Sequence, residues 1–483
     1  MSLSDARFKL LLYLGTLTFI LYLDRVCIGK AASAIEHDLG ISDGAMGWVF
    51  TAFTIAYGLF EIPTGSWGDR FGSRRILTRI VLWWSAFTIL TGCVPRFSWG
   101  LSTPAWLTAL LSGREIVLAI DSFLLLLVVR FLFGAGEAGA LPNAARVVSR
   151  WYPRRERGLA HGVILTCMLV GGAASPILAG NIIASWGWRW AFLLFGLLGL
   201  VWAALFHDWF RDDPAEHPDV SPAELQLIHS DSPARDAKSP HPPVPWSFVV
   251  SSSNVWLLGG IISCAAFASY FYFNWFPRYL ENGRGVAEKD TGFLAGMVLA
   301  GGACGSLAGS VIASWLDRRG EQGRWQRPLV GCGLMVAAGI FVRLSLEFES
   351  PLLATLCVTL AFGLAQAQQA TWWAVVADIS GKHLGAMFGL MNSLGVPGAS
   401  LSTVFAGQFV ESRKAAGFVG RAAWDPVLNY YVAVLVVGGI LWLLVDPRRS
   451  AVEPDAETAE ALLAGRLTPI PPEDLAPEPV PAG

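Results

Sequence analysis

The chain has 483 residues, of which 54% are hydrophobic and only 15% charged, and its formal net charge is −2. A soluble domain usually carries about 25% charged residues, so the composition excludes an ordinary soluble enzyme and indicates a membrane protein. The near-neutral charge gives no reason to expect a nucleic-acid partner. The seven cysteines show no Cys-x-x-Cys spacing, which argues against a disulfide framework or a zinc site.

Twelve apolar runs are long enough to cross a bilayer, which takes about 20 mostly apolar residues. They cover residues 10–28, 44–63, 76–94, 118–141, 158–182, 190–208, 253–277, 291–314, 328–346, 351–376, 384–408 and 427–445. Because the runs lack the alternation of a membrane barrel, we expect an all-α membrane protein. The first run follows basic residues as in a signal peptide, but it contains charges and no convincing cleavage site, so we expect it to be retained.

The Lys and Arg residues predict the orientation. With both termini inside, the inner segments hold 22 of the 35 basic residues and the outer segments hold 11, while Arg25 and Arg130 lie within helices. Cytoplasmic loops carry the excess of basic residues. We therefore expect a multi-pass protein of the cell inner membrane with both termini in the cytoplasm.

The polar stretch 209–250 separates six runs from the other six. We predict a six-helix bundle over 1–208, a cytoplasmic central loop over 209–250, a second six-helix bundle over 251–447 and a disordered acidic tail over 448–483. Within the loop, Ser221 and Glu224 form a capping-box pattern that predicts a short surface helix. The outer segment 95–117 is longer than a turn requires.

The two halves repeat each other weakly. Asp69-Arg70 follows the second run and Asp317-Arg318 follows the eighth, and the fifth and eleventh runs both open with Gly-x-x-x-Gly. Matching features at equivalent places predict two pseudo-symmetric bundles, as many transporters have.

The segment 65–75, GSWGDRFGSRR, resembles the signature loop of the major facilitator superfamily, and the resemblance covers residues 5–448. YLDR at 22–25, RFLFGAGEAG at 130–139 and WFP at 275–277 are similar to the anion:cation symporter family, which includes carriers of sugar acids, phthalate and sialic acid. The resemblance implies a transporter that works by alternating access, but it does not fix the substrate.

Asp24 and Arg25 are adjacent charges inside the first predicted helix. A charge within the membrane costs from about 2.5 to more than 10 kcal/mol by different estimates, so such residues are usually functional. A mutually neutralised structural pair is the alternative, but successive helical residues point about 100° apart. We expect Arg25 to face a cavity and Asp24 to find another partner.

Arg130 and Glu137 lie two turns apart on one face of the fourth helix, about 10 Å along the axis and too far for a direct salt bridge. Each should meet substrate, a proton or the first helix, although Arg130 could instead snorkel to the interface. A guanidinium offers bidentate hydrogen bonds to a carboxylate, and a buried carboxyl can titrate near neutral pH. The resemblance implies the same roles: Asp24 and Glu137 carry protons, while Arg25 and Arg130 bind the anion.

Glycines at 134, 136 and 139 match a dinucleotide-binding spacing, but we interpret them as packing residues because they lie inside a membrane helix. Other helices offer polar and aromatic candidates for substrate contact, with helix bridging as the alternative role. The resemblance favours Tyr22, Tyr57, Thr371, Trp372 and Asn392, and Asn274 stands where similar carriers often have a small hydroxyl residue.

The inner loop of the first half carries the charges Asp69, Arg70, Arg74 and Arg75. They either set the topology or, as the resemblance implies, form a gate in which Asp69 caps a helix of the second half. Glu61 stands where the family often has a neutral amide; it could be a third titrating acid, but we expect it to pair with a basic loop residue, because charges near helix ends cost less than charges at mid-depth.

The sequence therefore predicts a monomeric, proton-coupled symporter that imports a small organic anion such as a hexuronate, aldonate or aldarate. An exporter of the same fold is the first alternative, although a site for cationic drugs would favour unpaired acids over two arginines. A membrane sensor or a membrane enzyme is a weaker alternative, because the sequence shows no signalling domain, nucleophile–base set or metal-ligand cluster. We expect no cofactor and no metal.

Overall fold

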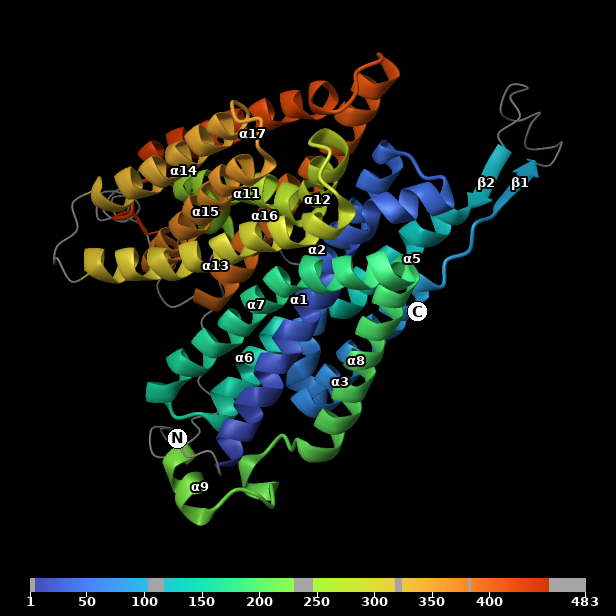
Figure 1. The fold of residues 1–483 in the computed structure, drawn as a ribbon. Helices are drawn as coiled ribbons and strands as arrows, with labels where there is room; N and C mark the ends of the chain where they lie inside the picture. Colours follow the sequence, from blue (N-terminus) through green and yellow to red (C-terminus); the bar gives the residue numbers. More distant parts are fainter. Residues whose placement is uncertain (1–4, 103–116, 230–245, 318–323, 381–383, 451–483) are drawn as a thin grey trace, which may run out of the picture.

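The computed structural model describes residues 5–102, 117–229, 246–317, 324–380 and 384–450. Long helices form two bundles, one from each half of the chain (Figure 1). The first bundle contains α1 (Ala6–Leu39), α2 (Asp43–Phe71), α3 (Ser73–Gly92), α5 (Ser122–Glu137), α6 (Ala140–Trp151), α7 (Arg154–Trp186) and α8 (Trp188–Trp209). The second contains α11 (Ser253–Asn274), α12 (Phe276–Arg278), η2 (Tyr279–Gly283), α13 (Glu288–Asp317), α14 (Gln326–Ser345), α15 (Pro351–Ile379), α16 (Leu384–Ala415) and α17 (Arg421–Leu444).

Each of the twelve predicted runs falls on one of these long helices. By length and composition alone, nine spans among the described residues could cross a membrane, and α2, α3 and α16 do not meet that criterion. These helices carry large exposed apolar side chains such as Leu82, Trp83 and Leu401. Such side chains suit a surface that faces lipid.

A two-stranded antiparallel sheet precedes the fourth long helix. β1 (Ser98–Ser102) pairs with β2 (Val117–Asp121). The predicted helical run 118–141 therefore begins later, at the first residue of α5. Asp121 caps that helix, because its carboxylate accepts a hydrogen bond of 2.9 Å from the backbone N–H of Leu124.

The same run also ends early, at a break between α5 and α6. Gly139 lies at the break with φ of 85°, a left-handed conformation that favours glycine. The prediction that all three glycines lie inside one helix was thus wrong at Gly139. Gly134 does serve packing, since a Cβ added there would lie 2.4 Å from the carbonyl oxygen of Phe53.

The two bundles touch most extensively along α2 with α16 and α7 with α13, and α1 also contacts α11 and α12. A Cβ added to Gly47 would lie 2.6 Å from the carbonyl oxygen of Thr403, and one added to Gly292 would lie 2.4 Å from that of Pro176. Glycines at these places therefore allow the backbones of the two halves to approach closely.

The central segment is anchored to the start of α1. It contains η1 (Pro214–Glu216), α9 (Pro222–His229) and α10 (Trp246–Ser251). The predicted surface helix α9 starts as expected, because Ser221 Oγ accepts a hydrogen bond of 3.2 Å from the backbone N–H of Glu224. The Glu224 carboxylate, however, accepts hydrogen bonds from the backbone N–H and Nε of Arg7, at 3.0 and 3.1 Å.

We call the end that holds the N-terminus and α9 the inner end, following the predicted orientation, and the end that holds the α1–α2 turn the outer end (Figure 1). Much of the predicted central loop and nearly all of the predicted tail, residues 230–245 and 451–483, lie outside the described residues.

Candidate functional site

Arg25 of α1 lies at the interface between the two bundles. Its guanidinium is 2.9 Å from the carboxylate of Glu137, which α5 contributes. Aromatic rings surround the guanidinium, with centroids 4.5 Å away for Tyr57, 4.8 Å for Phe53 and 5.2 Å for Tyr22. These cation–π contacts hold the cation in place and limit its contact with water.

Arg130 lies two turns before Glu137 on α5. Its side chain is 1% exposed, so it points into the protein rather than toward the interface. It packs over the rings of Phe133 and Phe53, at 4.3 and 5.4 Å. Among the residues that the structure describes, Arg130 has no hydrogen-bond or ion-pair partner, and its Nε is buried without one. A buried, unpaired guanidinium is costly unless an anion joins it.

Both arginines line one central cavity. Its walls come from α1, α2 and α5 of the first bundle and from α11 of the second, through Tyr22, Arg25, Phe50, Phe53, Arg130, Tyr270, Phe273 and Asn274. The cavity encloses about 50 Å³, room for a water molecule or two. Its charged groups are the two guanidiniums, with the Glu137 carboxylate in contact with one of them.

Asp24 points away from this cavity. Its side chain is 1% exposed and accepts a hydrogen bond of 3.4 Å from Thr88 Oγ1 on α3, while its Oδ1 is buried without a hydrogen-bond partner. The helix rotation separates it from Arg25, and no ion pair joins the two among the described contacts. Asp24 therefore lies between α1 and α3, behind the residues that face the cavity.

The structure places Tyr22 and Asn274 on the cavity wall and Tyr57 against Arg25. Asn392 lies elsewhere at the interface, where its amide donates a hydrogen bond of 2.9 Å to Glu61. Among the described residues this amide, and not a basic residue, is the hydrogen-bond partner of Glu61, because α2 and α16 run side by side.

Thr371 and Trp372 of α15 are buried inside the second bundle and do not line the described cavity. Trp372 Nε1 donates a hydrogen bond of 2.9 Å to the carbonyl oxygen of Leu258 on α11, so it bridges two helices. The Thr371 hydroxyl is buried without a hydrogen-bond partner among the described residues. In this conformation the helix-bridging alternative holds for Trp372.

Sequence reasoning missed Tyr270 and the three phenylalanines of the cavity wall. Tyr270 lies one helical turn before Asn274, so its position on the same face of α11 was a usable signal. Phe50 and Phe53 lie among many apolar residues of α2, where the sequence shows nothing that distinguishes a cavity wall from a lipid-facing surface.

Comparisons with known proteins agree with this architecture. Residues 14–403 match the family model described as Major Facilitator Superfamily. The chain belongs to the major facilitator superfamily. It is accordingly a multi-pass membrane transporter and not an enzyme.

Two bacterial relatives of this superfamily align along most of the chain. The "Probable sulfoacetate transporter SauU" of Cupriavidus necator is 30% identical over 455 residues, 92% of this chain and 94% of the relative. The "Probable galactarate/D-glucarate transporter GudP" of Bacillus subtilis is 30% identical over 453 residues, 90% of this chain and 93% of the relative.

A solved structure shares the fold. The crystal structure of a bacterial homolog of the human lysosomal transporter Spinster, inward-facing and unoccupied, matches with a TM-score of 0.72 and 19% identity. The alignment covers 93% of this chain and 99% of that one. The match supports the superfamily fold of two helix bundles.

The superfamily signature segment, residues 65–75, covers the end of α2 and the start of α3 at the inner end, with Gly72 between the two helices. The side chains of Asp69 and Arg70 lie outside what the structure describes. Arg74 Nε donates a hydrogen bond of 2.8 Å to the carbonyl oxygen of His207 on α8, within the first bundle. Arg75 is exposed to the surroundings of the molecule. The described contacts of Arg74 therefore hold the first bundle together and do not reach the second.

Ion pairs that sequence reasoning missed join the two bundles at the outer end. Lys30 Nζ of α1 is 2.5 Å from the Glu281 carboxylate of η2, and the Lys30 side chain is fully buried. Arg278 of α12 pairs with Glu36 and, at 2.7 Å, with Asp43. No sequence motif marks these pairs, because their partners are more than 200 residues apart.

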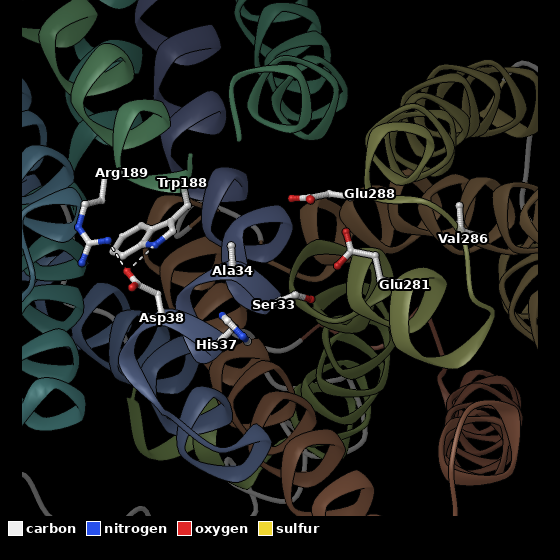
Figure 2. A pocket seen from close by; sticks show the side chains of 9 residues that line it. All are labelled: Ser33, Ala34, His37, Asp38, Trp188, Arg189, Glu281, Val286 and Glu288. Atoms are coloured by element: carbon white, nitrogen blue, oxygen red, sulfur yellow. Dashed lines mark hydrogen bonds and ion pairs between the residues drawn. The ribbon is translucent and has the colours of Figure 1, made fainter. Parts of the chain in front are cut away.

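A second cavity, of about 560 Å³, lies beside these ion pairs (Figure 2). Figure 2 shows Ser33 and His37 of α1 on one wall and Glu281 and Glu288 of the second half on the other. Trp188 Nε1 donates a hydrogen bond of 3.1 Å to Asp38 on the first-bundle side. Along α1, Lys30 lies between Arg25, which lines the central cavity, and Ser33, which lines the outer cavity. The buried Lys30 therefore separates the two cavities.

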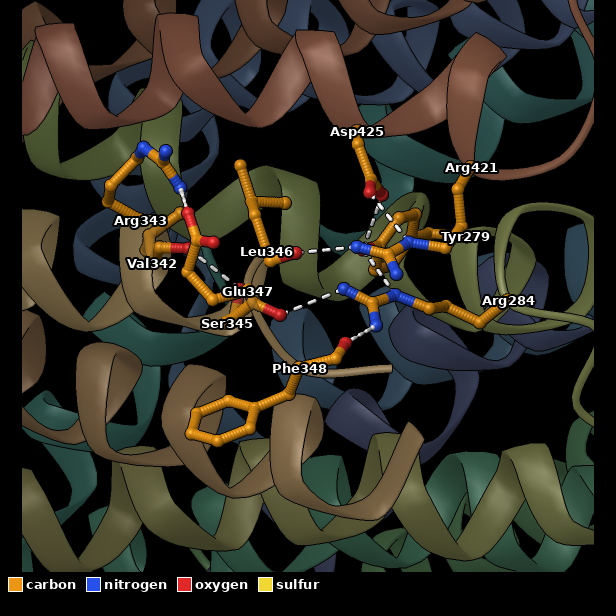
Figure 3. A network of polar contacts seen from close by, with 10 residues as sticks. All are labelled: Tyr279, Arg284, Val342, Arg343, Ser345, Leu346, Glu347, Phe348, Arg421 and Asp425. Carbon is orange, nitrogen blue, oxygen red and sulfur yellow. Dashed lines mark hydrogen bonds and ion pairs between the residues drawn. The ribbon is translucent and has the colours of Figure 1, made fainter. Parts of the chain in front are cut away.

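A polar network fixes η2 within the second bundle (Figure 3). Tyr279 Oη donates a hydrogen bond of 2.9 Å to Asp425 on α17. Arg284 donates one of 2.8 Å to the carbonyl oxygen of Ser345 at the end of α14, and Arg421 donates one of 2.5 Å to that of Leu346. Glu281 is therefore attached to the second bundle, and its contact with Lys30 joins one bundle to the other.

Proposed function

We propose that this protein is a proton-coupled symporter that imports a small organic anion across the cell inner membrane, with both termini in the cytoplasm. The observation that carries the proposal is Arg130, a buried guanidinium on the cavity wall without a described partner, close to a second guanidinium, Arg25. Two cations accompanied by one carboxylate leave a positive cavity, which attracts an anion and repels a cationic drug.

The substrate class follows from the donors. A carboxylate can accept two parallel hydrogen bonds from each planar guanidinium. Hydroxyl groups of a sugar acid would find the phenol groups of Tyr22 and Tyr270 and the amide of Asn274. The names of the relatives, which refer to sulfoacetate and to galactarate and glucarate, support a small organic acid. We assign a hexuronate, aldonate or aldarate.

Glu137 supplies the coupling to protons. While it is ionised, its carboxylate occupies one guanidinium, Arg25, at 2.9 Å. Protonation removes this competing carboxylate and frees Arg25 for the substrate anion. We assign a second proton to Asp24, because a buried carboxylate without a cation in contact is costly when charged. Because Asp24 lies behind Arg25 and does not line the cavity, its protonation affects anion binding indirectly.

Transport requires the two bundles, residues 1–208 and 251–447, to move against each other as units. A cavity of about 50 Å³ is too small for a six-carbon acid, so loading must widen the interface. The pairs of Lys30 with Glu281 and of Arg278 with Asp43 close the outer end in this conformation. Opening toward the outside must separate these charges.

Uptake into proteoliposomes tests the proposal. Purified protein should accumulate a radiolabelled sugar acid from a panel that also holds sulfoacetate and a cationic drug, when the inside is alkaline. Accumulation should collapse with a protonophore, and R130Q should abolish it. Accumulation of the cationic drug instead of the acids would favour the exporter alternative and overturn the proposal.

A further inference from the structure

A groove on the first bundle lies at its inner end, away from both cavities on the transport path. It is an open hollow of about 490 Å³ along one face of α3, with His207 of α8 at its side. Its walls are Arg75, Thr78, Arg79, Leu82, Trp83, Ala86 and His207. None of these residues takes part in the proposed transport site.

The groove is basic at its inner end. Arg75 is exposed and has no ion-pair or hydrogen-bond partner among the described residues. The Arg79 guanidinium lies 4.5 Å from the centroid of the Trp67 ring, and stacking on a ring leaves the N–H groups at the edge of the guanidinium free to donate. No Asp or Glu is among the residues that line the groove.

The groove becomes apolar toward the middle of α3. Leu82 and Trp83 are each 44% exposed, although both are large apolar side chains. Leu82 lies seven residues after Arg75, which corresponds to about 10 Å along the helix axis. A ligand in this groove would therefore meet cations at one end and an apolar wall about 10 Å deeper.

We propose that this groove binds one anionic phospholipid, with the headgroup phosphate at Arg75 and Arg79 and an acyl chain along Leu82 and Trp83. Basic pockets between helices on the cytoplasmic side suit anionic lipid headgroups. The order of charges followed by apolar side chains matches a lipid that stands in the inner leaflet. A free inorganic anion would gain nothing from the apolar wall, so the lipid is the better occupant.

Native mass spectrometry of the purified full-length protein tests this proposal. The probes are phosphatidylglycerol and phosphatidylcholine with identical acyl chains, and inorganic phosphate in a parallel thermal-shift titration. The test variant is R75Q/R79Q. The matched control, R448Q/R449Q, removes two exposed arginines from the inner end of the second bundle.

Wild-type protein and the control should bind phosphatidylglycerol in preference to phosphatidylcholine. R75Q/R79Q should bind phosphatidylglycerol roughly tenfold more weakly or worse, since each interfacial arginine contributes several-fold to anionic-lipid binding, and it should keep its melting temperature without lipid. Equal binding of both lipids, equal loss in the control, or stabilisation by inorganic phosphate as strong as that by phosphatidylglycerol would overturn the proposal.

Discussion

The Arg25 guanidinium and the Glu137 carboxylate form an ion pair of 2.9 Å that joins α1 to α5 beside the central cavity. A substrate carboxylate that binds Arg25 must therefore compete with a carboxylate of the protein itself. Arg130 has no such competitor among the described residues, and in the proposed mechanism it is the first anchor of the anion. In the proposed mechanism this competition links proton binding at Glu137 to anion binding at Arg25.

Replacing Glu137 with Gln should separate binding from coupling. In the wild type, anion affinity should fall as pH rises from 5.5 to 8, because ionised Glu137 regains Arg25. E137Q should bind the anion at pH 8 about as well as the wild type binds it at pH 5.5. Titration calorimetry across this pH range measures the anion affinity of the wild type and of E137Q. Counterflow exchange should survive in E137Q, whereas proton-driven accumulation should fail; normal accumulation would show that Glu137 is not a coupling site.

Replacing Arg130 with Lys should weaken anion binding by roughly 10- to 100-fold, because a point ammonium cannot replace the planar, bidentate fork. R25K should also lose affinity, but its loss should depend on pH, since the new ammonium group would still face Glu137. Ligand-induced stabilisation of purified protein measures these effects, with R449K as a control on an exposed arginine. Unchanged affinity in both cavity variants would remove the anion site from these arginines.

The fold could be predicted almost completely from the sequence. Hydrophobic length locates every long helix, and the superfamily model confirms the family. The errors in the predicted helix bounds occurred where the local backbone conformation, and not hydrophobicity, decides where a helix begins or ends. The strand β2 precedes the fourth helix and Gly139 ends it in a left-handed conformation, and neither feature alters the apolar count on which the prediction depended.

The charged residues of the candidate site could be predicted, because charged residues are rare within membrane helices. Arg25, Arg130 and Glu137 stand out because each is an ion in an apolar run, and the structure brings all three together. The cavity wall from α11 was less accessible, since Tyr270 resembles any other aromatic residue of a membrane helix. Contacts between the halves, such as Lys30 with Glu281, depend on tertiary packing, and no local pattern encodes them.

Replacing Asp24 with Asn should leave the fold intact. Asp24 makes a hydrogen bond to Thr88 and is not the described counter-ion of Arg25. If it were, D24N would lose about 3–5 kcal/mol of stability, and D24N/R25Q would recover it. We expect a D24N melting temperature within a few degrees of the wild type, no rescue by the double variant, and loss of proton-driven uptake. A stability gain in D24N/R25Q relative to D24N would contradict this prediction.

Reversing either charge of the Lys30–Glu281 pair should open the outer end. The pair is 2.5 Å long and the Lys30 side chain is fully buried, so K30E or E281K would place like charges in contact, with a cost of several kcal/mol. Because this contact joins one bundle to the other, the cost falls on the outward-closed state, and the population of the open state should rise. The double variant K30E/E281K should restore closure.

Phe50 lines the central cavity, on the far side of Lys30 from the outer end, and provides the readout. In a background that lacks the exposed Cys93 and Cys304, a cysteine introduced at position 50 should react with a membrane-impermeant maleimide at least tenfold faster in either single variant than in the parent, and slowly again in the double variant. The matched control is R343E, which reverses one charge of the exposed Arg343–Glu347 pair within α14 and its end. That pair does not connect the bundles, so R343E should leave the labelling rate unchanged. Equal acceleration by R343E, or a double variant that labels as fast as the single variants, would show that Lys30 and Glu281 do not hold the outer end closed.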